Sequence, residues 1–174
     1  KGPGVALFTA LENTLGELPI IAEDLGVITP DVVALREKFS FPGMCILQFA
    51  FGGDPADRFL PHNYVRNSVV YTGTHDNNTT LGWFNTSSSA ERDFCLKYLG
   101  SCGEDIVANM IRTIWSSVAS FSIAPMQDFL NLDIHARMNY PSKADGNWCW
   151  RMAPNAESVE LAGRIRDLNF LYSR

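Results

Sequence analysis

Residues 44–51, MCILQFAF, form an almost unbroken apolar run in which polar and apolar side chains do not alternate. A strand that is buried on both faces has this pattern, and such strands occur in parallel sheets covered by helices. Similar runs predict further strands at Leu18–Ala22, Ser68–Thr72 and Ala119–Met126. We therefore expect a parallel sheet, and we assign the Met, Ile and Phe side chains of residues 44–51 to its core.

Helices are predicted between and after these strands. One begins at Thr29-Pro30 and has apolar residues at helical spacing, and others are predicted at 90–99, 104–117 and 157–172. Alternating strands and helices predict parallel βαβ units, and therefore an α/β fold. Four such strands suit half of a (β/α)₈ TIM barrel, which typically needs about 250 residues. Because no repeat or linker divides the chain, we expect residues 1–174 to form a single unit that cannot close a barrel alone.

The composition is that of an ordinary globular chain and excludes several classes of partner. With 14 basic and 19 acidic side chains, the net charge is -5, and no basic stripe is present of the kind that binds nucleic acid or an anionic membrane. No apolar stretch reaches the roughly 18 residues that span a bilayer. The four cysteines form no CxxC pair, which favours a reduced, intracellular compartment. The chain opens on Lys-Gly-Pro-Gly without Met, so we expect a fragment.

Two adjacent carboxylates, Glu23 and Asp24, follow the predicted strand Leu18–Ala22. Alternation sends their side chains to opposite sides, so that one can face a barrel mouth while the other turns toward the next helix. A carboxyl group shielded by apolar neighbours can serve as a general acid near neutral pH. The alternative is a helix cap or a salt bridge in a loop.

A second polar cluster, THDNNT at residues 74–79, follows the predicted strand Ser68–Thr72. Its side chains can hydrogen-bond sugar hydroxyls, and Asp76 can hold negative charge near a developing oxocarbenium ion. An Asx-rich turn capped by Asn77 and Thr79 explains the same residues equally well. The three histidines have no metal-ligand spacing, so we expect no metal site.

A third group joins Arg, Asn and Trp in irregular sequence, as ARMNYP at 136–141 and GNWCWR at 146–151. Aromatic faces beside amide and guanidinium donors suit a carbohydrate, whose C–H faces stack and whose hydroxyls accept hydrogen bonds. A loop that packs on the core through its two Trp residues is the alternative.

Seven segments of the chain, in order, resemble the 4-α-glucanotransferases called amylomaltase or disproportionating enzyme. They are IIAEDLGVITPDV, FPGMCILQFAF, LPHNY, YTGTHDN, PMQD, ARMN and GNWCWR. The resemblance covers nearly the whole chain. It implies the C-terminal half of an α-amylase-like (β/α)₈ barrel that acts on α-1,4-glucans by a retaining double displacement.

The resemblance also implies roles for particular residues. Glu23 matches the general acid/base, Asp76 the carboxylate that stabilises the transition state, and Asp24 a structural neighbour. It implies no cofactor and no metal. The residues expected to bind substrate are His75, Asn77, Arg137, Asn139, Asn147 and Trp148.

A retaining enzyme of this family also needs a nucleophilic carboxylate, which lies in an upstream Arg-x-Asp motif. No Arg-x-Asp occurs among the 174 residues. Two hypotheses follow. The first is an enzyme that transfers segments among maltooligosaccharides, starch or glycogen chains with glucose as an acceptor, in the cytoplasm or alternatively the plastid stroma. The second is a truncated remnant that binds glucan without catalysis.

Overall fold

A three-stranded parallel sheet lies at the centre of the protein, whose computed structural model describes residues 2–174. Its strands are β1 (Gly43–Ile46), β2 (Ser68–Tyr71) and β3 (Phe121–Ile123), and they lie side by side in that order. The pairing register brings the carboxyl ends of all three strands level. The predicted α/β class and the parallel pairing are confirmed, and polar residues that follow these strands are gathered at one edge of the sheet.

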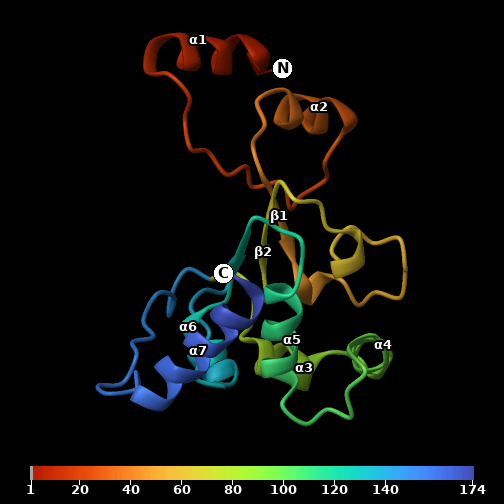
Figure 1. Ribbon diagram of the computed structural model, residues 1–174, viewed down its shortest axis with the longest axis vertical. Coiled ribbons are helices and arrows are strands. Elements are labelled where there is room, and N and C mark those ends of the chain that lie inside the picture. Colours follow the sequence, from red (N-terminus) through yellow and green to blue (C-terminus); the bar gives the residue numbers. More distant parts are fainter. Residues whose placement is uncertain (1) are drawn as a thin grey trace.

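Helices make up most of the remaining regular structure (Figure 1). The chain from β2 to β3 contains three helices, whereas the chain from β1 to β2 contains only short 3₁₀ turns. Each predicted helix is present, and three helices that were not predicted accompany them. The seven helices within the described residues are α1 (Val5–Leu15), α2 (Pro30–Lys38), α3 (Thr80–Thr86), α4 (Ser89–Leu99), α5 (Ile106–Trp115), α6 (Met126–Phe129) and α7 (Val159–Tyr172). The 3₁₀ turns are η1 (Leu47–Phe49), η2 (Pro61–Asn63) and η3 (Ile134–Ala136).

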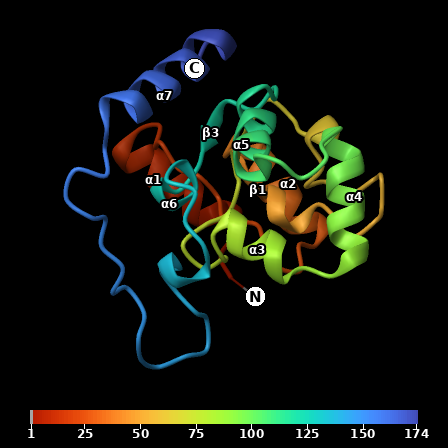
Figure 2. The ribbon, with the colours of Figure 1, turned by 90° about the horizontal axis from the view of Figure 1, so that it is seen from below.

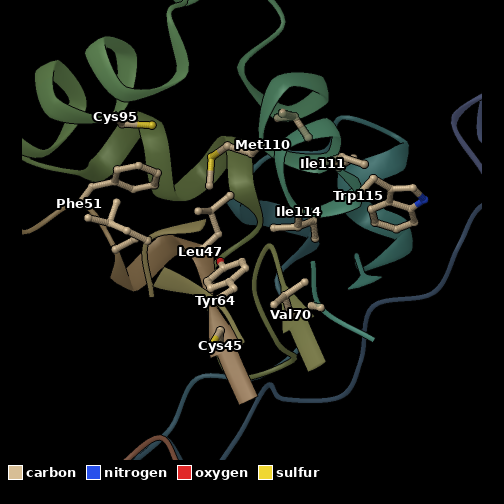
Figure 3. Packing of buried hydrophobic residues seen from close by; sticks show 14 of the residues in the cluster. Cys45, Leu47, Phe51, Tyr64, Val70, Cys95, Met110, Ile111, Ile114 and Trp115 are labelled. Carbon is tan, nitrogen blue, oxygen red and sulfur yellow. The ribbon is translucent and has the colours of Figure 1, made fainter. Parts of the chain in front are cut away.

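The hydrophobic core lies between the sheet and α5. One face of this helix is apolar, and six of its ten residues are buried. Met110 and Ile114 point toward Leu47 and Val70, so the helix closes one face of β1 and β2 (Figure 3). Burying side chains of this size contributes about 1.5–3 kcal/mol each. This packing makes the sheet and α5 a rigid base for the loops at the carboxyl ends of the strands.

The first forty residues are built differently. Neither α1 nor α2 contains a buried residue, and both stand apart from the body formed by the sheet and α3–α5 (Figure 1). Contacts between the rings of Phe8, Phe39 and Phe41 join α1 to the end of α2 and the start of β1. Figure 2 shows a second peripheral element, α7, which follows a long loop that runs outside the body.

The prediction of a strand at Leu18–Ala22 was wrong. These residues have no regular secondary structure. Ala22 N–H donates to the Pro42 carbonyl at 2.9 Å, next to the start of β1, but one such bond does not make a ladder. An apolar run gives a segment the composition of a strand, whereas a strand exists only where a neighbour supplies successive hydrogen bonds.

The other predicted strands are shorter than expected. Residues 44–51 leave the sheet after Ile46 and form the 3₁₀ turn η1. Likewise, the run 119–126 is a strand only at β3, and α6 begins directly after Pro125. Within residues 2–174, no helix is both long enough and apolar enough to cross a bilayer.

Candidate active site

A pocket of about 620 Å³ opens at the carboxyl ends of the three strands. Tyr71 and Ile123, the last residues of β2 and β3, form part of its wall, and Phe49 of η1 forms another part. Glu23 and Asp76 both line it. Two carboxylates that lie 53 positions apart in the sequence therefore face one space, at the edge of the sheet where (β/α)₈ enzymes place their chemistry.

Asp76 is fixed by residues of a distant segment. Its Oδ1 accepts a hydrogen bond from Asn139 Nδ2 at 2.6 Å, and its carbonyl accepts one from Arg137 Nη2 at 2.6 Å. His75 Nε2 lies 3.4 Å from the same Oδ1. Asn139 N–H also donates to the His75 carbonyl at 3.1 Å. The side chain and the backbone of Asp76 are thus both held before any ligand binds.

The loop that carries Asp76 combines both interpretations of residues 74–79. Asn77 Oδ1 accepts from the N–H and the hydroxyl of Thr74, at 2.9 and 2.8 Å, and closes the turn of residues 74–77. Thr79 caps α3 by accepting from Gly82 N–H at 3.1 Å. His75 and Asp76 lie between Thr74 and Asn77, within this turn, and line the pocket. The turn is therefore the support that presents the imidazole and the carboxylate.

The Trp-rich segment meets this loop from the other side. The Trp148 ring lies 5.0 Å from the His75 ring between centroids, and both residues line a second pocket of about 150 Å³ together with Asn77 and Arg137. Trp148 is 53% exposed, so the alternative of a Trp buried in the core is wrong for this residue. Its indole face is accessible beside a guanidinium and an imidazole, a combination that suits a sugar ring.

Asn147 has a different position from its neighbour Trp148. Its Oδ1 accepts from Tyr140 N–H at 2.8 Å, and its Nδ2 donates to the Lys143 carbonyl at 2.8 Å. These bonds close the loop from residue 140 to residue 147. The amide group is thus engaged within its own loop, which holds the backbone that leads into Trp148.

Glu23 is exposed, and its placement depends on the residue that follows it. Glu23 Oε1 accepts from Leu25 N–H at 3.1 Å, within its own segment. Asp24 is only 3% exposed and accepts from Met44 N–H at 2.8 Å and from Arg58 Nη1 at 3.2 Å. A Cβ atom on Gly43 would lie 2.6 Å from Asp24 Oδ2, so a larger residue there would displace this carboxylate. Asp24 is thus the structural neighbour expected from the sequence, and it fixes the segment of Glu23 to β1.

Apolar side chains line much of the pocket between the two carboxylates. Phe49 is 44% exposed there, so its assignment to the core was wrong. The reason is η1, which turns the chain out of the sheet after Ile46 and presents the ring to the pocket. Burial raises the pKa of Tyr71, so its hydroxyl stays protonated and can donate a hydrogen bond at neutral pH.

Comparisons with known proteins show which family the chain belongs to. Residues 1–157 match the profile of the 4-alpha-glucanotransferases. The chain belongs to the 4-alpha-glucanotransferase family. It is 50% identical over 175 residues to the 4-alpha-glucanotransferase of Synechocystis sp., a match that covers 99% of this chain and 35% of the relative. It is 48% identical to the chloroplastic/amyloplastic 4-alpha-glucanotransferase of Arabidopsis thaliana, covering 99% of this chain and 31% of the relative.

A solved structure gives the same result for the fold. The amylomaltase from Streptococcus agalactiae in complex with acarbose superposes with a TM-score of 0.93 at 34% identity, over 99% of this chain and 35% of that one. The α/β fold described above therefore matches part of an amylomaltase. The chain spans about a third of the length of the curated relatives it matches. This 4-alpha-glucanotransferase family member carries Glu23 and Asp76 in one pocket.

Proposed function

We propose that this chain is the C-terminal half of the catalytic (β/α)₈ barrel of a 4-alpha-glucanotransferase, with residues 1–174 as one unit. The whole enzyme transfers α-1,4-glucan segments among maltooligosaccharides, starch or glycogen chains, with glucose as an acceptor. The observation that carries this proposal is that Glu23 and Asp76 line one pocket at the carboxyl ends of adjacent parallel strands. Membership of the family supports the reaction class.

The two carboxylates of this chain take different parts in a retaining double displacement. A nucleophilic carboxylate, supplied from outside these residues at about 5–5.5 Å from the acid/base, attacks the anomeric carbon. Glu23 donates its proton to the departing glycosidic oxygen as the covalent glycosyl-enzyme forms. Glu23, now ionised, then takes the proton from an acceptor hydroxyl, whose oxygen attacks the anomeric carbon and displaces the nucleophile.

Asp76 acts on the charge that develops in the transition state of each of these two steps. The oxocarbenium-like transition state places positive charge on the reacting sugar, and a carboxylate held in advance stabilises it without reorganising. The hydrogen bonds from Asn139 and Arg137 hold Asp76 in place. Asp76 is therefore suited to fixed electrostatic stabilisation, and the exposed Glu23 to proton transfer.

Polar and aromatic residues around the pocket bind the glucan in this proposal. His75, Asn77 and Arg137 line the pockets beside Asp76, and Trp148 offers an indole face for stacking. Asn139 acts through Asp76. Asn147 contributes by closing the loop that leads into Trp148. We place the enzyme in the cytoplasm. The plastid stroma is the alternative, because the Arabidopsis relative is chloroplastic/amyloplastic.

The test is a chimera in which this chain replaces the matching segment of the Synechocystis enzyme, to which it is 50% identical. The purified chimera is incubated with maltotriose, and its products are separated by chromatography. We expect release of glucose and formation of longer oligosaccharides whose new linkages are α by NMR. A folded chimera that binds maltoheptaose but forms no transfer product would contradict the proposal and support the non-catalytic remnant.

A further inference from the structure

One buried carboxylate has no part in the roles assigned above. Asp128 belongs to α6 and is 2% exposed. It accepts three hydrogen bonds: from Thr72 Oγ1 at 2.6 Å, from Thr80 N–H at 2.8 Å and from Thr80 Oγ1 at 2.7 Å. Thr72 directly follows β2, and Thr80 is the first residue of α3. One carboxylate therefore holds both ends of the loop 73–79, which contains Asp76.

A second buried side chain holds the same loop from η1. Gln48 is 5% exposed, and its Nε2 donates to the Asn78 carbonyl at 3.0 Å. Its backbone N–H donates to the Thr72 carbonyl at 3.2 Å. A Cβ atom at position 73 would lie 2.5 Å from Gln48 Nε2, so a larger residue there would displace this amide. The loop lies against a buried polar network and not against apolar core.

The residue next to Asp128 anchors the other segment that meets Asp76. Gln127 is 8% exposed, and its Nε2 donates to the Ala136 carbonyl at 3.2 Å. The chain continues from there into Arg137 and Asn139, which donate to Asp76. Asp128 and Gln127, neighbours in α6, thus hold two segments. Asp128 holds the loop that carries Asp76, and Gln127 holds the segment whose side chains donate hydrogen bonds to Asp76.

Burying a carboxylate at this place costs free energy. Burial raises the pKa of Asp128, although the hydrogen bonds from Thr72 and Thr80 act in the opposite direction. A buried polar group of this kind is tolerated when it is fully hydrogen-bonded, and such networks fix a unique geometry. Because the groups that it binds are the two ends of one loop, the geometry that it fixes is that of the loop.

We propose that Asp128 is a positioning residue for Asp76, which sets the carboxylate of Asp76 in the pocket by holding both ends of the loop 73–79. The inference rests on the proposed function, because the positioning matters for turnover only if Asp76 stabilises the transition state. Displacement of a catalytic group by about 1 Å costs on the order of 10²-fold in rate. Removal of the positioning bonds should therefore lower kcat more than it raises KM.

The experiment compares kcat and KM of the maltotriose reaction in the chimera, with Asp128→Asn as the main variant. Its amide keeps the shape and an acceptor for Thr80 N–H but loses the charge that the two hydroxyls face. We expect kcat to fall about 10- to 100-fold with KM changed by less than about 3-fold. Asp93→Asn, the same change at an exposed position of α4, is the matched control and should leave both constants unchanged.

A double-mutant cycle shows whether Asp128 acts through Asp76. If it does, adding Asp128→Asn to an Asp76→Asn chimera should lower kcat by less than about 3-fold further, because the group to be positioned is already disabled. Equal factors in both backgrounds would overturn the proposal, and so would near-normal kcat in a folded Asp128→Asn chimera. If Asp76→Asn itself keeps normal turnover, the proposed function fails and this inference fails with it.

Hydrogen exchange provides a readout that does not depend on activity. In the Asp128→Asn chimera, amide exchange should rise in residues 73–80 and stay unchanged in α4, which none of the three hydrogen bonds of Asp128 reaches. Unchanged exchange in the loop would overturn the proposal. If Asp128→Asn does not fold, Thr72→Val removes one of the three donors and is judged by the same two measurements.

Discussion

The two carboxylates of the candidate site come from regions with very different support. Asp76 lies on a loop of the packed body, and its Oδ1 accepts from Asn139 at 2.6 Å. Glu23 lies in the segment that joins α1 and α2, two helices that bury no residue. The hydrogen bond to Glu23 comes from Leu25, within its own segment. The neighbouring Asp24 fixes that segment by accepting from Met44 N–H of β1 and from Arg58.

This difference corresponds to two different catalytic tasks. A general acid/base has to protonate one oxygen and later deprotonate another, so its carboxyl group must stay accessible to both. A group that stabilises developing charge is most effective when it is fixed in advance. We infer that the exposed Glu23 is suited to the first task and that the hydrogen-bonded Asp76 is suited to the second.

The largest expected effect is that of Glu23→Gln, which removes the proton donor and keeps the side-chain size. General acid/base assistance is worth about 10² to 10⁴ in rate, so kcat for maltotriose in the chimera should fall by at least the lower value. Glu17→Gln, at an exposed position of the same region, is the control and should leave kcat unchanged. Normal turnover by Glu23→Gln would remove Glu23 from the mechanism.

Asp76→Asn should have the next largest effect. The substitution deletes the charge and keeps the shape, and loss of one preorganised electrostatic partner costs about 10²- to 10³-fold in kcat. Because the group acts mainly in the transition state, KM should change little. Steady-state kinetics with maltotriose measure both constants. A rise in KM with unchanged kcat would indicate that Asp76 only binds the ground state.

Asn139→Ala tests how much the support of Asp76 contributes. It removes the hydrogen bond to Oδ1, and a hydrogen bond to a charged group is worth about 1.5–3 kcal/mol. We expect kcat to fall by about 10-fold or somewhat more. Asn85→Ala, at an exposed position of α3, serves as the control. Near-normal kcat in Asn139→Ala would show that Asp76 needs no such support, and the contrast with Glu23 would lose its basis.

Ser88→Ala should affect stability and leave catalysis unchanged. Ser88 and Glu91 form a capping box at the start of α4, and loss of such a cap costs about 0.5–2 kcal/mol. Thermal unfolding of the chimera at pH 7 should shift downward, while Ser89→Ala should not change it. A fall in kcat at a temperature where the Ser88→Ala variant is fully folded would contradict the expected separation of stability from catalysis.

The same cap makes part of the stability dependent on pH. Hydrogen bonds from Ser88 lower the pKa of Glu91. The contribution of Glu91 is therefore complete above its ordinary pKa and is lost as the pH falls through the lowered value. The difference in unfolding temperature between the parent chimera and Ser88→Ala should shrink over that acidic range. A difference that stays constant would show that the carboxylate takes no part in the cap.

The sequence was a good guide to elements whose signals are local. Helix α4 has its cap signal in Ser88 and Glu91 and its end at Gly100, and α5 has an apolar face at helical spacing. The strand predicted at Leu18–Ala22 is absent because the hydrogen-bond ladder that makes a strand depends on a neighbouring strand. The assignment of Phe49 to the core was wrong because a turn that follows four strand residues cannot be recognised within an apolar run.

The candidate site shows the same limit. The pairing of Asn139 with Asp76 joins residues 63 positions apart, and Asp128 reaches Thr72 across 56. Nothing in the residue types identifies these partners. Asp128 lies in the PMQD segment, but only the structure shows that its carboxylate is buried against Thr72 and Thr80. The residues that face the pocket were predicted better than the residues that hold them there.

The most direct test of the central claim, that the two carboxylates have different tasks, compares two donors in the chimera. Maltotriose needs protonation of its leaving group, whereas α-glucosyl fluoride needs little. The account predicts that Glu23→Gln transfers glucose from glucosyl fluoride to maltose at a rate much closer to that of the parent than it does from maltotriose. It predicts that Asp76→Asn is impaired to a similar extent with both donors. Equal rescue of the two variants, or rescue of Asp76→Asn alone, would contradict the account.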